Sequence, residues 1–128
     1  MEGVEFVDLT QKSTPRIYGE RGRLPYSKRP GESQESYWKR HHLWKRYGLL
    51  IEEYEAMREA QDNKCAICGS TDPARKDGDW DVDHDHATGK VRGLLCHHCN
   101  IVIGSAQDNI DTLKAAIVYL EQWQERLG

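Results

Sequence analysis

Two Cys-x-x-Cys pairs, Cys65 with Cys68 and Cys96 with Cys99, constrain the fold of this chain more than any other feature. Each pair puts two thiolates on one tight turn, and two such pairs supply the tetrahedral sulfur ligands that structural zinc prefers. Disulfides would need an oxidising compartment, yet the chain starts at Met1 without an apolar export segment. A redox pair is expected near a βαβ pattern, whereas these pairs flank an acidic, histidine-rich segment. We therefore predict a structural Zn²⁺ site.

The composition indicates one small domain with a tail. The chain has 128 residues and a hydrophobic content of 38%, which allows only a modest core. A bound zinc ion would add folding free energy that such a core cannot supply. No apolar run approaches the roughly 20 residues needed to cross a membrane. We therefore expect a cytoplasmic protein without a membrane partner.

The charge is unevenly distributed along the chain. The net charge is −3, but basic residues outnumber acidic ones by ten to three between residues 11 and 46. A basic segment joined to an acidic one suits a protein that holds a polyanion with one part and collects metal ions with another. An ordinary solvated tail beside an acidic surface is the alternative.

The pattern of residues divides the chain into an arm and a domain. Residues 1–32 are rich in Pro, Gly, Ser and Arg, and we predict a flexible basic arm there. Residues 33–128 would form the domain, with a helical lead-in over 33–60 that pauses at Gly48. A zinc and hairpin core would occupy 61–107, and an amphipathic helix 108–126.

Within the core, alternation predicts a β-hairpin. Trp80 and Val82 alternate with Asp79, Asp81 and Asp83, which indicates a strand with one buried face. A turn containing a glycine follows, and residues 91–95 would form the return strand that delivers the second cysteine pair to the zinc.

The run from Val82 to Asn100, Val-Asp-His-Asp-His-Ala-Thr-Gly-Lys-Val-Arg-Gly-Leu-Leu-Cys-His-His-Cys-Asn, resembles the core of the phage recombination endonuclease VII family. That family is a branch of the HNH, or ββα-metal, nucleases. Tyr47-Gly48, the Glu52-Glu53-Tyr54 helix and the 65–69 knuckle also match its lead-in, so the resemblance covers residues 37–122. It implies an α+β fold: a ββα-metal (HNH, or His-Me finger) nuclease core with a four-cysteine zinc knuckle, flanked by helices.

The resemblance also implies site residues. His84 would be the general base, because a neutral imidazole can take a proton from water near neutral pH. Asp83 and Asn100 would hold one Mg²⁺ through hard oxygen ligands, and Mn²⁺ could replace it. In a regular strand Asp83 and His84 would point to opposite faces, but the family brings them together where the strand becomes irregular. His86 either orients the phosphate or water, or is a surface residue.

Other polar residues are candidates for contact with DNA. On the first helix they are Lys39, Arg40, Lys45 and Arg46, because an exposed helix face presents such groups without cost. Arg92 would either clamp a phosphate or pair with a hairpin aspartate. We expect Asp85 to be structural or exposed, and His97 and His98 to face solvent.

These features predict a phage-encoded, metal-dependent endonuclease that nicks or cuts duplex DNA in the host cytoplasm. Resolution of branched DNA is the alternative activity. It requires two active sites in a fixed relation, hence a homodimer, and the short segment after Asn100 disfavours it. Phage packaging or recombination proteins would be further partners. A zinc-knuckle DNA-binding module without catalysis would explain the cysteines and the basic segment, but not the presence of Asp83, His84 and Asn100 together.

Overall fold

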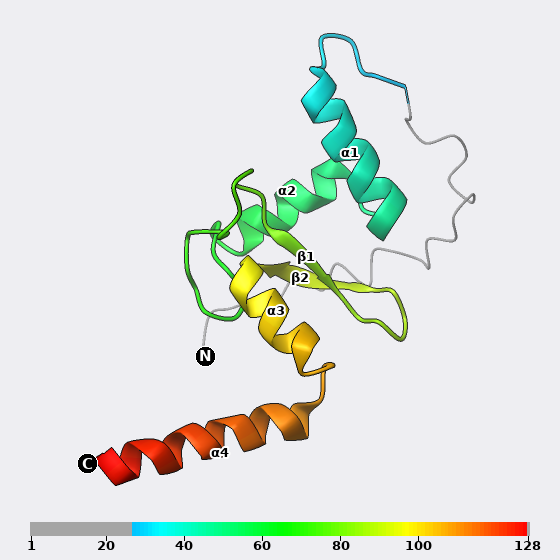
Figure 1. Ribbon diagram of the computed structural model, residues 1–128. Helices are drawn as coiled ribbons and strands as arrows, with labels where there is room; N and C mark the ends of the chain where they lie inside the picture. The colour runs from blue at the N-terminus through cyan, green and yellow to red at the C-terminus, as the bar shows by residue number, and fades with distance from the viewer. Residues whose placement is uncertain (1–26, 128) are drawn as a thin grey trace.

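The computed structural model describes residues 27–127, and the predicted arm over 1–32 lies mostly outside them. In this part of the chain two helices precede a β-hairpin and two helices follow it (Figure 1). The elements are α1 (Gln34–Tyr47), α2 (Ile51–Ala60), β1 (Asp81–His84), β2 (Val91–Leu95), α3 (His97–Ser105) and α4 (Ile110–Leu127). The predicted α+β class is confirmed.

Capping residues set the bounds of α1. The Ser33 hydroxyl accepts a hydrogen bond from the backbone N–H of Ser36 at 3.1 Å, which satisfies one of the free N–H groups at the helix start. Gly48 adopts the left-handed conformation with φ +62°, and its N–H donates to the carbonyls of Leu43 and Trp44. Glycine adopts this conformation at little cost, so the predicted stop at Gly48 is confirmed.

The hairpin is antiparallel, and its register is irregular at one position. Val82 lies opposite Leu94 and Asp83 opposite Gly93, but the register shifts between Asp83 and His84. Because His84 pairs with Val91, Arg92 is the extra residue, and the bulge bends β2 and changes the direction of its side chains. The irregular backbone predicted after Asp83 thus lies on the facing strand, and Asp83 and His84 remain consecutive residues of β1.

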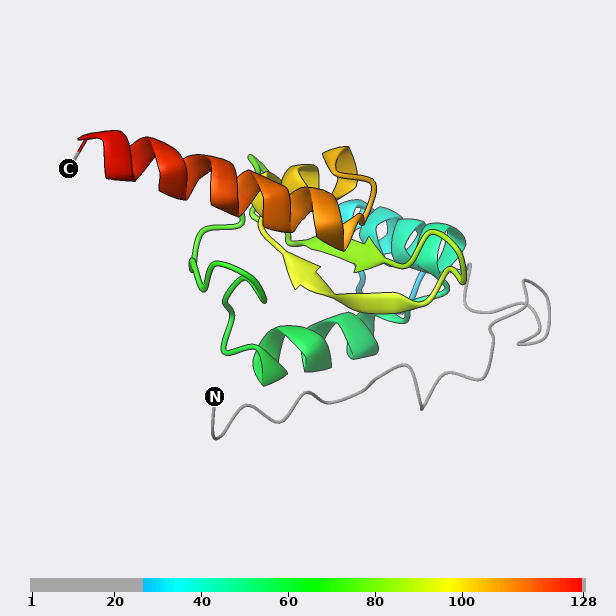
Figure 2. The ribbon, with the colours of Figure 1, turned by 90° about the horizontal axis from the view of Figure 1, so that it is seen from below.

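The core lies between the hairpin and the helices on either side of it. Figure 2 shows α2 on one side of the sheet and α3 on the other, and both helices pack against β2. Leu94 is fully buried, and the phenol oxygen of Tyr54 accepts a hydrogen bond from the backbone N–H of Trp80 at 3.0 Å. The other buried apolar residues are Leu43, Leu49, Met57, Cys65, Val82, Leu95 and Cys96.

Two predictions about exposed charge are wrong. The alternation places Asp81 and Asp83 on a solvent-facing side of β1, but both are buried because basic and amide side chains cover them. The sequence places Arg40 on an exposed helix face, but it is only 4% exposed. Its guanidinium donates two 3.0 Å hydrogen bonds to the carboxylate of Glu32 and one of 2.9 Å to the carbonyl of Ser27.

The last helix, α4, lies apart from the hairpin (Figure 1). The side-chain oxygen of Asn109 accepts a hydrogen bond from the N–H of Thr112 at 3.0 Å, which caps the helix start. Seven of its large apolar residues are more than half exposed: Ile110, Ile117, Val118, Tyr119, Leu120, Trp123 and Leu127. Among residues 27–127, no helix is both long and apolar enough to span a bilayer.

Candidate metal and catalytic site

The four cysteines come together as the sequence predicts. One sulfur from each lies within 4.8 Å of all the others, and the sulfurs of Cys68 and Cys96 are 3.8 Å apart. The first pair sits on a turn in which Gly69 N–H donates to Cys65 O at 3.0 Å. The second pair lies where β2 passes into α3. Four sulfurs at this spacing fit the tetrahedral coordination of a metal such as zinc.

The thiols of the cluster differ in their affinity for protons. Burial raises the pKa of Cys65, but backbone N–H groups of Cys96, Cys68 and Ile67 outweigh it and lower the pKa to about 6. Burial and hydrogen bonds from Cys96, Cys68 and Cys65 raise the pKa of Cys99 to about 12. Burial likewise raises the pKa of Cys96. Without metal, Cys65 therefore ionises more readily than Cys96 and Cys99.

Asp83 is held by Arg92 from the neighbouring strand. Arg92 Nε donates to one carboxylate oxygen at 2.7 Å and its NH2 group donates to the other at 2.9 Å. This two-point contact raises the already high pKa of Arg92. Of the two expectations for Arg92, pairing with a hairpin aspartate is the one that the structure contains.

A second carboxylate links Arg92 to the hairpin histidines. Asp108, in the loop between α3 and α4, accepts a hydrogen bond from Arg92 at 3.2 Å and faces Nδ1 of His86 at 3.3 Å. These contacts lower the pKa of Asp108. The rings of His86 and His84 lie 4.7 Å apart, and the ring of Tyr47 lies 5.6 Å from that of His84.

His84 is half-buried at the end of β1, and its ring lies next to those of Tyr47 and His86. Within residues 27–127, no hydrogen bond to either of its ring nitrogens is found. Asp85, by contrast, has a structural role. Its carboxylate accepts hydrogen bonds from the N–H groups of Ala87 at 2.8 Å and Thr88 at 3.3 Å, and so shapes the hairpin loop.

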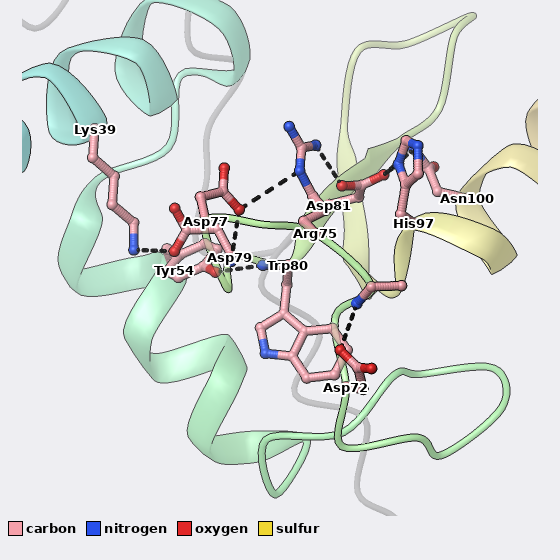
Figure 3. Close-up of polar contacts among 11 residues, drawn as sticks. Lys39, Tyr54, Asp72, Arg75, Asp77, Asp79, Trp80, Asp81, His97 and Asn100 are labelled. Atoms are coloured by element: carbon pink, nitrogen blue, oxygen red, sulfur yellow. Dashed lines mark hydrogen bonds and ion pairs between the residues drawn. The ribbon is translucent and has the colours of Figure 1, made fainter.

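Asn100 contacts a residue that the sequence analysis did not single out. Its Nδ2 lies 3.0 Å from Oδ2 of Asp81, and the same oxygen is 2.9 Å from Nδ1 of His97 (Figure 3). Arg75 donates to the other oxygen at 2.7 Å. Burial raises the pKa of Asp81, but these three contacts outweigh it and leave the pKa below its usual value. The alternation around Asp81 suggested only an exposed strand position.

The basic candidates on α1 differ in their surroundings. Lys45 and Arg46 are exposed in the last turn, and the Arg46 guanidinium lies 5.6 Å from the Tyr47 ring centre. Lys39 is half-buried, and its ammonium group lies 2.7 Å from a carboxylate oxygen of Asp79 (Figure 3). Exposed cations are therefore concentrated near the end of α1, close in sequence to Tyr47.

A β-hairpin, a following helix and a four-cysteine cluster define a small α+β protein, in which a cysteine knuckle of a geometry that suits a metal lies beside a carboxylate- and histidine-rich edge. The model of the family described as recombination endonuclease VII matches residues 40–122. The chain therefore belongs to the recombination endonuclease VII family, as its resemblance indicated.

Two phage proteins are similar to this chain. The gene 59 protein of Mycobacterium phage D29 is 48% identical over 77 residues, which cover 59% of this chain and 46% of the relative. The gene 59 protein of Mycobacterium phage L5 is 45% identical over 75 residues, which cover 58% of this chain and 44% of the relative. The chain thus matches less than half the length of these relatives. No solved structure gives a significant match.

Proposed function

We propose that the chain is a phage-encoded, metal-dependent DNA endonuclease of the HNH type, in which β1, β2 and α3 form the ββα-metal core. The observation that carries this proposal is the set of side-chain contacts at the end of β1. There the register shifts between Asp83 and His84, with Arg92 as the extra residue on β2, and Arg92, Asp108 and His86 link Asp83 to His84 through side-chain contacts. A general base and a cation ligand are needed at one place for hydrolysis of a phosphodiester.

His84 would be the general base. Its half-buried ring is free to accept a proton from water, and the rings of Tyr47 and His86 restrict its orientation. His86 would orient the phosphate or the attacking water, because its contact with Asp108 fixes one ring nitrogen and leaves the other. The ring is mostly exposed, so it is accessible to substrate.

Asp83 and Asn100 would hold the catalytic cation. They supply one carboxylate and one amide oxygen, which are hard ligands of the kind Mg²⁺ binds in proteins, and Mn²⁺ would be accepted as well. When bound, Mg²⁺ would neutralise charge that develops on the phosphate. Arg92 already provides a positive charge to Asp83, and its guanidinium would compete weakly with the cation for the carboxylate.

The cysteine cluster would hold a structural zinc ion. Asn100 follows Cys99 directly, and Cys96 Sγ accepts the N–H of Cys99 at 3.4 Å at the start of α3. Zinc at this position would fix the first turn of the helix that carries Asn100, without contact with substrate.

Lys45, Arg46 and Arg92 would contact DNA phosphates. Lys39 would do so once its ammonium group is released from Asp79.

Incubation of the zinc-loaded protein with supercoiled plasmid, with Mg²⁺ or EDTA, tests this function. Nicking or linearisation is expected with Mg²⁺ and not with EDTA. A protein that shifts plasmid on a gel under both conditions without cutting it would contradict the nuclease proposal, and would identify a zinc-knuckle DNA-binding module instead.

One observation favours resolution of branched DNA as a second candidate function. The exposed apolar residues Ile110, Ile117, Leu120 and Leu127 recur along α4 at helical spacing, so a second copy of the chain could cover them. A dimer would hold two sites in a fixed relation, which paired cuts at a junction require. Packaging or recombination proteins of the phage would direct either activity to its DNA in the host cytoplasm.

A further inference from the structure

Asp81 is the most heavily hydrogen-bonded carboxylate near the proposed site, and no proposed step uses it. It is 7% exposed, and its carboxylate faces three side chains from two other segments. Arg75 reaches one oxygen, and His97 and Asn100, one helical turn apart on α3, reach the other (Figure 3). Each donor that forms a hydrogen bond to this buried carboxylate lowers the free-energy cost of burying its charge.

The chemistry of this contact selects one orientation of the Asn100 amide. A carboxylate paired with a guanidinium has only acceptor atoms to offer, whereas an amide has one donor end and one acceptor end. Asn100 can therefore meet Asp81 only through its NH₂ group. Its carbonyl oxygen must then point away from Asp81, and it is this oxygen that can ligate a cation.

We propose that Asp81 is a positioning residue that orients the Asn100 amide so that its oxygen faces the cation. The inference rests on the proposed function, because it assumes that Asn100 is a cation ligand. His97 and Arg75 support the same carboxylate from two sides and so fix its position. Partners that orient metal ligands in this way commonly contribute about 10- to 100-fold to metal affinity.

The first test measures Mn²⁺ binding by electron paramagnetic resonance in the zinc-loaded chain. Asp81→Asn has the same shape but offers either an acceptor or a donor to Asn100, so the amide is no longer held in one orientation. We expect Mn²⁺ to bind about 10- to 100-fold more weakly to Asp81→Asn. Asp79→Asn is the matched control: Asp79 pairs with Lys39 at 2.7 Å, and the affinity of this variant should stay at the wild-type value.

The second test is a double-mutant cycle with cleavage of plasmid as its readout. If Asp81 acts through Asn100, Asp81→Asn slows the wild-type enzyme but does not slow Asn100→Ala any further. A merely structural role would slow both backgrounds by the same factor and would overturn the inference. Wild-type Mn²⁺ affinity in Asp81→Asn would overturn it as well.

A spectroscopic readout on the unaltered chain covers the case in which Asp81→Asn folds poorly. The side-chain NH₂ of Asn100 should give resonances of an amide that is hydrogen-bonded and fixed, and these should shift when Mg²⁺ is added. A freely rotating amide would contradict the inference.

If the wild type cuts DNA and needs Asn100 while substitution of Asp81 has no effect, this inference alone fails. A wild type that neither binds Mn²⁺ nor cuts DNA would refute the proposed function and the inference together.

Discussion

Individual thiols determine how the cysteine cluster would take up metal. The pKa values of Cys96 and Cys99 are raised, so both are protonated at neutral pH without metal, whereas Cys65, with a pKa of about 6, is mostly ionised. Since zinc binds thiolates, Cys96 and Cys99 must lose their protons when it binds. The affinity for zinc should therefore rise with pH across the neutral range.

We predict that zinc binding at pH 7 releases at least the two protons of Cys96 and Cys99. Calorimetric titration of the metal-free protein in buffers of different ionisation enthalpy counts these protons. A heat of binding that is the same in every buffer would show that no proton is released, and would contradict the account of the cluster.

A second prediction at the scale of single residues concerns Arg92. Its guanidinium occupies both oxygens of Asp83 and is 37% exposed, so solvent weakens the competition between it and a cation. Arg92→Gln should therefore raise the affinity for Mn²⁺ by only about two- to fivefold. The same variant should bind DNA more weakly, because it has lost a phosphate contact. An Mn²⁺ affinity below that of the wild type would show that Arg92 does not compete for Asp83.

At the scale of the element, α1 carries one basic residue that stabilises the fold and others that would contact DNA. Its sequence does not show which is which. Arg40 points inward to Glu32, whereas Lys45 points outward. Arg40→Ala should lower the free energy of unfolding and the melting temperature, since it leaves the carboxylate of Glu32 without its charged partner. Lys45→Ala should leave the thermal melt unchanged and weaken DNA binding. Equal melting temperatures for the two variants would contradict this division.

Elements with strong local signals could be predicted from sequence. Gly48 as a helix stop, the return strand ending at Leu95, and the tight turn of the first cysteine pair depend on interactions between near neighbours in the chain. Burial of Asp81 could not be predicted, because its partners Arg75 and Asn100 become neighbours only when α3 packs on β1. An aspartate that alternates with apolar residues has the same pattern whether water or an arginine covers it.

At the scale of the whole molecule, α4 carries most of the exposed large apolar residues in the described part of the chain. Its apolar residues would be covered in a dimer, which we predict forms at micromolar concentration. Ile117→Glu with Leu120→Glu should give monomers in sedimentation experiments, because two buried charges would oppose association. Gln122→Glu with Gln124→Glu adds the same charge at polar positions and should leave the dimer intact. A wild type that is monomeric at all concentrations would contradict the dimer.

The central claim is that the end of β1 is a nuclease site in which His84 takes a proton from water. Cleavage of supercoiled plasmid by His84→Ala, beside His98→Ala, tests it most directly. His98 is an exposed histidine between two cysteines of the cluster and has no proposed catalytic role. With zinc retained in both proteins, we expect His84→Ala to cut at least about 100-fold more slowly than the wild type and His98→Ala to cut normally. Equal rates for His84→Ala and the wild type would contradict the account.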